Sequence, residues 1–96
     1  MKILAMEKDV AGVTGERCEP YLREEAARVW ELYQEGVIRE IYFRQDRPQA
    51  VLILECDDAA GATQILGTLP LVRKGLIDFD AIPLKAYPGF SRLFGR

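Results

Sequence analysis

The sequence lacks histidine entirely, and this absence restricts its chemistry more than any other feature. A chain without imidazole has no histidine acid or base near neutral pH, no Cys–His or Ser–His nucleophile pair, and no histidine ligand for haem or zinc. It has only two cysteines, Cys18 and Cys56, and we expect both to be thiols rather than a disulfide. We therefore expect neither a metal site nor a cofactor.

Long apolar runs and a basic surplus are also missing. No stretch approaches the roughly 18 apolar residues of a membrane-spanning helix, and the opening MKILAMEKD is too short for the apolar part of a signal peptide. The formal net charge is -2 over 96 residues, whereas proteins that bind nucleic-acid phosphates usually carry a basic excess. These features predict one cytoplasmic domain, residues 1–96, with neither a membrane nor a nucleic acid as partner.

Four stretches have the alternation or the apolar and β-branched content of strands. They are KILAMEK (2–8), VIREIYFR (37–44), QAVLILEC (49–56) and LIDFDAIPL (76–84). One helix is expected from Pro20 to the terminating Gly36, and another from a cap at Asp57 or Asp58 to Pro70. The order β-α-β-β-α-β predicts a ferredoxin-like α+β fold, in which a four-stranded antiparallel sheet carries two helices on one face.

The stretch QAVLILEC is apolar on both of its faces except near its end, as in strands that are buried on both sides. Two helices cover only one face of a sheet, so the other face needs a cover of its own. A second copy of the chain is the simplest cover, because a two-fold axis pairs like surfaces. We therefore expect a homodimer.

Alternation divides the side chains of each strand between two faces. Those expected to face the helices are Leu4, Met6, Val37, Ile41, Phe43, Leu52, Leu54, Cys56, Ile77, Phe79 and Ala81. Those expected on the other face include Ile3, Ala5, Ile38 and the polar set Glu7, Glu40, Tyr42, Arg44, Glu55, Asp78 and Asp80. The first helix is expected to turn a helically spaced stripe toward the core, namely Leu22, Ala26, Val29, Trp30 and Tyr33.

The carboxylates of the face without helices suggest a pocket that a second copy would close. A carboxylate enclosed among apolar neighbours has a raised pKa, as a general acid or base near neutral pH requires. The same acids also fit a plainer interpretation, in which they keep a sheet edge soluble or form ion pairs across the dimer. Both interpretations remain open at the level of the sequence.

Residues 86–96 form an aromatic arm after the last predicted strand. Tyr87, Phe90 and Phe94 have no evident place in the core of their own chain. We predict that this arm is an oligomerisation segment that docks on a neighbouring subunit. The alternative is an arm that folds back over its own sheet edge.

Three further features carry a resemblance to a known family. Glu35-Gly36 leads into VIREIYFR, a helix ends at Leu69-Pro70-Leu71, and LIDFDAIPL is followed by YPGF. In these features the chain resembles the dimeric α+β barrel superfamily, and within it the muconolactone isomerase-like family. The resemblance implies βαββαβ units that pair their sheets into a barrel, and rings of such dimers. It also implies a cofactor-free proton transfer in a cleft between sheet and helices, near Arg39 and Tyr42.

Two functional hypotheses follow. The first is a cofactor-free isomerase or lyase that acts on a small organic acid or lactone. Glu40 or Asp78 would be its general base and Tyr42 its acid or orienting group, while Arg39 or Arg44 would anchor a substrate carboxylate. The second is a non-catalytic homo-oligomer that binds a small ligand or a protein partner in the same cleft.

Overall fold

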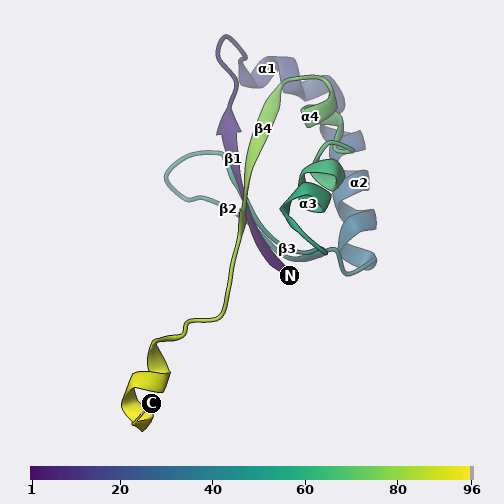
Figure 1. The fold of residues 1–96 in the computed structure, drawn as a ribbon. Coiled ribbons are helices and arrows are strands. Elements are labelled where there is room, and N and C mark those ends of the chain that lie inside the picture. The colour runs from purple at the N-terminus through teal and green to yellow at the C-terminus, as the bar shows by residue number, and fades with distance from the viewer. Residues whose placement is uncertain (96) are drawn as a thin grey trace.

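The alternating stretches form a four-stranded antiparallel sheet in the computed structural model, which describes residues 1–95. The strands are β1 (Lys2–Asp9), β2 (Ile38–Phe43), β3 (Ala50–Glu55) and β4 (Ile77–Pro83). Their order across the sheet is β2-β3-β1-β4, so β1 and β3 are central. The four predicted strands and the ferredoxin-like α+β arrangement are confirmed (Figure 1).

The helices that precede the last strand lie together on one face of the sheet, which we call the covered face (Figure 1). They are α1 (Gly15–Cys18), the 3-10 helix η1 (Glu19–Tyr21), α2 (Leu22–Gln34), α3 (Ala59–Leu66) and α4 (Pro70–Arg73). The two predicted helices correspond to α2 and α3, and Pro20 lies in the η1 turn just before α2. Within residues 1–95, no helix is both long enough and apolar enough to cross a membrane.

Two predicted helix boundaries are confirmed. Gly36 follows α2 with a φ of +80°, a left-handed conformation that glycine adopts without strain, and the chain turns there into β2. Asp58, rather than Asp57, caps α3, and its carboxylate accepts the N–H of Gly61 at 2.7 Å.

The core lies between the covered face and the helices. Its largest fully buried side chains are Ile3, Ile38, Leu52, Leu54 and Leu69. Burial of a side chain of this size contributes roughly 1.5–3 kcal/mol, so these few residues account for much of the stability of a small domain. The predicted core positions Leu52 and Leu54 of β3 are confirmed, and Ala62 and Leu66 of α3 are buried as well.

The predicted faces of β1 are wrong. Ile3 and Ala5 are completely buried in the core, whereas Leu4 and Met6 are only partly buried and lie on the opposite face, which we call the uncovered face. Because β1 is apolar on both sides, alternation alone does not decide which side meets the helices. The correction has a functional consequence, because it moves Glu7 from the uncovered face to the covered one.

The predicted faces at the start of β2 are also wrong, because the strand contains a β-bulge. Ile38 lies opposite Leu54 and Glu40 lies opposite the adjacent Ile53, so Arg39 is an extra residue in the register. Ile38 therefore faces the core instead of the uncovered face. Beyond the bulge the prediction is confirmed: Ile41 and Phe43 lie on the covered face, and Glu40 and Tyr42 on the uncovered face.

Trp30 does not belong to the core, contrary to the prediction. It is 57% exposed and stacks on Tyr33, with 6.0 Å between the ring centroids. The more buried line of α2 instead runs through Glu25, Val29 and Leu32, at spacing i, i+4 and i+7. Because this line begins with the charged Glu25, the sequence favoured the less polar stripe that contains Trp30 and Tyr33 as the buried side of the helix.

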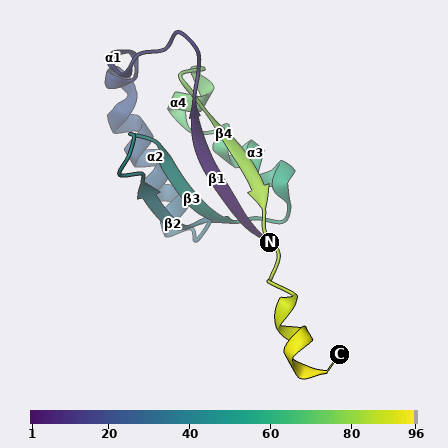
Figure 2. The same ribbon diagram turned by 90° about the vertical axis from the view of Figure 1, so that its left-hand side faces the viewer.

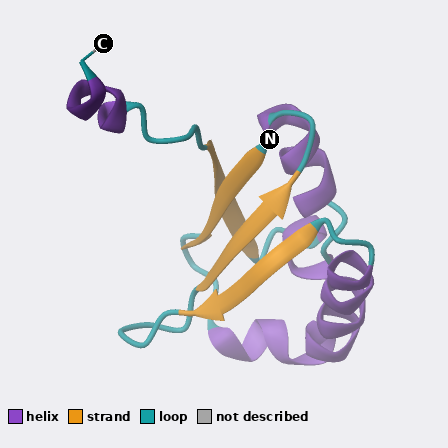
Figure 3. Ribbon diagram, turned by 90° about the horizontal axis from the view of Figure 1, so that it is seen from below, coloured by secondary structure: helices purple, strands orange, loops and turns teal. Residues whose placement is uncertain are grey.

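The arm after β4 projects away from the sheet and helices (Figures 2 and 3). It ends in the 3-10 helix η2 (Gly89–Phe94), and its side chains Tyr87, Phe90, Leu93 and Phe94 are exposed. The alternative of an arm folded back over its own sheet edge is therefore not what the structure adopts. Arg96, the last residue of the predicted arm, lies outside the described residues.

Candidate functional site

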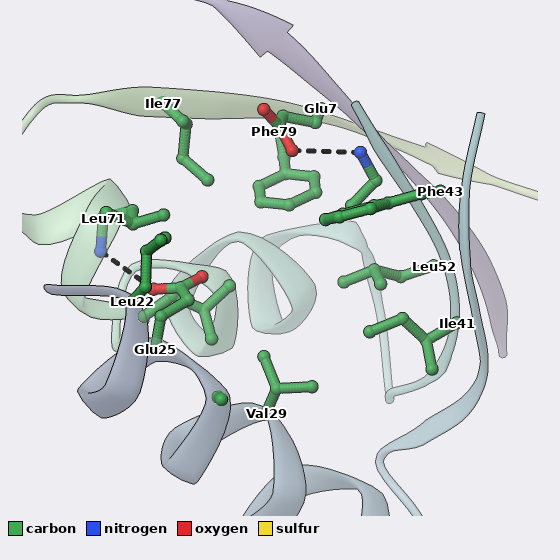
Figure 4. Close-up of a pocket in the computed structure, with 13 residues that line it drawn as sticks. Glu7, Leu22, Glu25, Val29, Ile41, Phe43, Leu52, Leu71, Ile77 and Phe79 are labelled. Carbon is green, nitrogen blue, oxygen red and sulfur yellow. Dashed lines mark hydrogen bonds between the residues drawn. The ribbon is translucent and has the colours of Figure 1, made fainter. Parts of the chain in front are cut away.

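A cavity of about 290 Å³ opens between the covered face and the helices α2 and α4 (Figure 4). Ligand sites usually have volumes of roughly 300–1,000 Å³, so this cavity suits a small molecule. Its lining residues are Glu7, Leu22, Glu25, Ala26, Val29, Ile41, Phe43, Ala50, Leu52, Leu69, Leu71, Ile77 and Phe79. All of these except the two glutamates are apolar. We call this cavity the carboxylate cleft.

Glu7 is positioned in the cleft by the period of β1. Ile3 and Ala5 point to the covered face, so Glu7, two residues further on, points there as well. The ladder between β1 and β3 ends at the pair Met6 and Val51. Glu7 Oε1 accepts the N–H of the next residue of β3, Ala50, at 3.0 Å. The carboxylate thus bonds to the backbone just where the strand pairing stops.

Glu25 enters the cleft from the opposite side, on the first turns of α2 (Figure 4). Its Oε1 accepts the N–H of Leu71 at 2.9 Å. Leu71 is in the first turn of α4, where amide groups have no partner within the helix and the N-cap Leu69 supplies no side-chain bond. Glu25 therefore links α2 to α4 and is itself fixed in direction.

The environment of the cleft raises the pKa of both glutamates. For Glu7 the main cause is burial, which outweighs the hydrogen bond from Ala50, and repulsion from Asp9 adds to the rise. For Glu25 the main cause is again burial, opposed by the bond from Leu71, and the charge of Glu7 raises the pKa further. The charge of Glu7 thus acts on Glu25 across the cleft, and each carboxylate holds a proton more tightly than an ordinary glutamate.

A second cavity, of about 400 Å³, adjoins the carboxylate cleft and shares Glu7, Leu22, Phe43, Leu71 and Ile77 with it. Its other lining residues come mainly from the end of β1 and from the connection to α1, namely Asp9, Val10, Val13, Thr14, Gly15, Cys18, Pro48 and Leu76. This outer cavity is more polar than the cleft. Glu7 lies at the junction of the two and is partly exposed.

Two of the predicted catalytic residues, Glu40 and Tyr42, lie together on the uncovered face. The Tyr42 hydroxyl donates to Glu40 Oε1 at 2.8 Å, and this bond raises the pKa of Tyr42. Both side chains are exposed. Neither lines the carboxylate cleft.

Asp78, the third predicted catalytic residue, is not brought near that pair within one chain. It lies on β4, and the central strands β1 and β3 separate β4 from β2. Its exposed carboxylate faces Lys8, whose Nζ lies 3.7 Å from Asp78 and 2.8 Å from Asp80. These ion pairs lie within one chain, whereas the plainer interpretation had the uncovered-face acids form ion pairs across a dimer or keep a sheet edge soluble.

The predicted carboxylate anchors, Arg39 and Arg44, also lie away from the cleft. Arg39 Nε donates to the carbonyl of Gly36. Arg44 forms an ion pair with Asp46 in the hairpin turn and donates to the Gln49 side chain at 3.3 Å. The resemblance implied a site between sheet and helices, and a cavity lies there, but β2 contributes Ile41 and Phe43 to it rather than Arg39 and Tyr42.

The two residues that matter most in the cleft were not chosen from the sequence, although a signal for them exists. Glu7 continues the buried series Ile3, Ala5, and Glu25 begins the buried series with Val29 and Leu32. An acid in phase with a buried series is the pattern to look for, because ordinary burial excludes charge.

Within residues 1–95, no group of three or more acidic or cysteine side chains is arranged to hold a metal ion. The two cysteines are thiols, each partly buried. No protein-family model matches the chain, and no curated protein matches it either.

Proposed function

We propose that the carboxylate cleft binds a small, mainly apolar molecule and that Glu7 and Glu25 transfer a proton within it, without a cofactor. The observation that carries this proposal is the pair of half-buried glutamates on opposite sides of an apolar cavity, each with a raised pKa. Such a pair is suited to acid–base work near neutral pH, because one carboxyl can be ionised while the other holds a proton.

The reaction that fits this arrangement is an isomerisation. The ionised glutamate takes a proton from a carbon of the substrate, and the electrons of that C–H bond move into the adjacent unsaturated system. The protonated glutamate gives its proton to a different atom, so the composition of the substrate is unchanged. Each turnover exchanges the protonation states of Glu7 and Glu25, so one proton must pass back from the glutamate that gained it to the one that lost it. This return goes through water of the outer cavity, which Glu7 and Asp9 line.

The resemblance to the muconolactone isomerase-like family supports the reaction type, and a lyase reaction begins with the same proton abstraction. Of the substrates that this resemblance suggests, a lactone fits the cleft better than a small organic acid. Among the described residues that line the cleft, none is basic, so a substrate carboxylate would have no cationic partner.

Deuterium exchange tests the proposal. Small unsaturated lactones in heavy water are followed by proton NMR with and without the protein. We expect the wild type to accelerate exchange at the acidic carbon, and we expect Glu7→Gln and Glu25→Gln to lower this rate by about 100-fold or more. Glu24→Gln, the same change on the exposed side of α2, is the matched control and should leave the rate unchanged.

The second hypothesis, a non-catalytic binding protein, uses the same cavity and is separated by the same experiment. It predicts that ligands perturb the cleft residues while the wild type produces no exchange above the rate in buffer. Wild-type acceleration that survives both glutamine substitutions would contradict the role given to the carboxylates.

The proposal includes an assembly of identical chains, a homodimer or a ring of dimers. The uncovered face would pair with that of a second copy, and the arm 86–96 would dock on a neighbouring subunit. Leu4, Met6, Val51 and Ile53 give the uncovered face an apolar centre, over which no helix of residues 1–95 lies.

Charge also supports docking of the arm on another copy. The arm contains Arg92 and Arg96 and no acid, whereas the whole chain has a net charge of -2. The rest of the chain is therefore distinctly acidic and complements the arm. We place this assembly in the cytoplasm, where thiols such as Cys18 and Cys56 stay reduced.

A further inference from the structure

The charged groups of the cleft all have the same sign. Glu7 and Glu25 line the carboxylate cleft, and Asp9 lines the outer cavity beside Glu7. No lysine or arginine lines either cavity among the residues that the structure describes. In an apolar cavity such charges are screened far less than on the surface, so they act strongly on the charge of any molecule that enters.

The internal hydrogen bonds of the two glutamates leave room for a ligand. Each uses Oε1 to accept a backbone N–H, from Ala50 for Glu7 and from Leu71 for Glu25. No buried side-chain oxygen in residues 1–95 lacks a partner, so the second oxygen of each glutamate is not sealed in the core. These oxygens can accept a hydrogen bond from a molecule in the cleft.

The apolar lining of the cleft determines what the uncharged part of the ligand must be. Figure 4 shows Val29, Leu52 and Phe79 around the cavity, with Phe79 beside Glu7. These side chains offer only carbon to a ligand, so its remaining surface must be hydrocarbon. A ligand carboxylate there would pay the cost of desolvation and would also be repelled by the negative charge of the glutamates. Both effects disfavour the binding of anions.

We propose that the carboxylate cleft selects small apolar amines, with the ammonium group held by Glu7 and Glu25 and the hydrocarbon part packed against Val29, Leu52 and Phe79. This inference rests on the proposed function for the location of the site, but not for the reaction. An ammonium donates up to three hydrogen bonds, which ionised and protonated carboxyl groups can both accept, and it compensates the charge of any carboxylate that is ionised. This makes it the best complement to the lining. An uncharged molecule is the next best occupant, and an anion is the worst.

Three probes of nearly equal size and shape test the charge preference: benzylamine, benzyl alcohol and benzoate. Their dissociation constants are measured by calorimetry or NMR titration at neutral pH and low salt. Hydrogen bonds to charged groups predict that benzylamine binds at least about tenfold more tightly than benzyl alcohol. Benzoate should bind more weakly than either.

Isosteric variants locate the effect. Glu7→Gln and Glu25→Gln should each weaken benzylamine binding by about tenfold while changing benzyl alcohol binding by less than about threefold, because only the charged interaction is lost. Glu24→Gln should change neither. Ala26→Phe, which adds bulk at an exposed position lining the cleft, should weaken all three probes alike.

The outcomes separate this inference from the proposed function. Benzoate or benzyl alcohol binding as tightly as benzylamine would overturn the amine preference, and weakening of that binding by Ala26→Phe would still support the cleft as the site. An amine preference that persists in both glutamine variants would overturn the role of the two carboxylates. Failure of all three probes to bind would also overturn the inference, while lactone exchange would continue to test the proposed function.

Discussion

Carboxylate side chains have different surroundings on the two faces of the sheet. On the uncovered face, carboxylates lie in water beside polar partners: Asp78 and Asp80 face Lys8, and Glu40 accepts from Tyr42. In the cleft, Glu7 on the covered face and Glu25 on the helix α2 that packs over it have only a backbone amide each and are otherwise surrounded by hydrocarbon. Burial therefore raises the pKa of the covered-face pair.

This difference shows why the identity of an acid says little about its role. The uncovered-face acids drew attention because they alternate visibly with apolar residues in LIDFDAIPL. The covered-face acids are single residues within apolar series, and only the fold shows that they face each other. A site for acid–base chemistry needs restricted solvation more than it needs many acids.

The largest expected difference between the faces concerns packing. Leu52 and Val51 are neighbours on β3 that point to opposite faces. Leu52→Ala should lower the free energy of unfolding by about 2–5 kcal/mol, because it leaves a cavity in the core. Val51→Ala should cost about 1 kcal/mol or less, in the range of a partly exposed position.

Urea unfolding of both variants at several protein concentrations checks this prediction. If the uncovered face is paired with a second copy, the cost of Val51→Ala will rise with the degree of association. Equal costs for the two substitutions at low concentration would mean that the faces do not differ as described.

Assembly provides the next test, since it decides whether the uncovered face stays open in solution. A chain that ends at Lys85 lacks the exposed aromatics of the arm. We expect light scattering to give the mass of a dimer or larger ring for the full chain, and a smaller number of subunits for the shortened one. A full chain that is monomeric would contradict both the paired sheets and the docking arm.

A smaller effect should appear in the pH dependence of stability. The raised pKa of Glu25 means that the folded state binds its proton more tightly than the unfolded state does. This contribution to stability is present below the ordinary glutamate pKa of about 4.3 and is lost as the pH rises through the raised value. Glu25→Gln should therefore gain stability relative to the wild type across that window, and Glu7→Gln should do the same.

Asp46 provides a control of opposite sign. Its hydrogen bond with Arg44 lowers its pKa, so its contribution is present above the ordinary aspartate value and is lost as the pH falls through the lowered one. Asp46→Asn should lose stability relative to the wild type as the pH rises over the acid range. Chemical unfolding at a series of pH values measures how the stability difference between each variant and the wild type changes with pH. If this change has the same sign for Glu25→Gln and Asp46→Asn, the opposite pKa shifts given to the two residues are wrong.

The smallest effect is expected for the ion pairs of the uncovered face. Lys8 is about half exposed, as are its partners Asp78 and Asp80. Exposed ion pairs contribute little to stability, so Lys8→Gln should leave the urea midpoint unchanged within error. A clear loss of stability that grows with protein concentration would instead place Lys8 in an interface.

The strands and the helix ends could be predicted because local sequence determines them. Alternation marked the strands, Gly36 marked the end of α2, and Asp58 provided a cap whose side chain reaches the backbone three residues on. Such signals depend on a few neighbouring residues. They place elements along the chain without fixing which side of an element meets the core.

The sides of β1, β2 and α2 required the three-dimensional structure. Leu4 and Met6 are as apolar as Ile3 and Ala5, so β1 has two acceptable faces. The extra residue at Arg39 changes the face to which Ile38 points, and no glycine within β2 indicates this bulge in the sequence. Glu25 takes a partly buried position on α2, because α4 offers an amide that only an acceptor can satisfy, while Trp30 stays exposed.

The carboxyl carbons of Glu7 and Glu25 can be observed individually by NMR in protein with isotope-labelled glutamate, titrated through the acid and neutral range with and without benzylamine. We expect both to titrate above the ordinary glutamate value and to shift on addition of the amine, while Glu24 does not respond to it. If both titrate at the ordinary value, or if the amine shifts other glutamates and leaves these two unmoved, the carboxylate cleft is not the functional site.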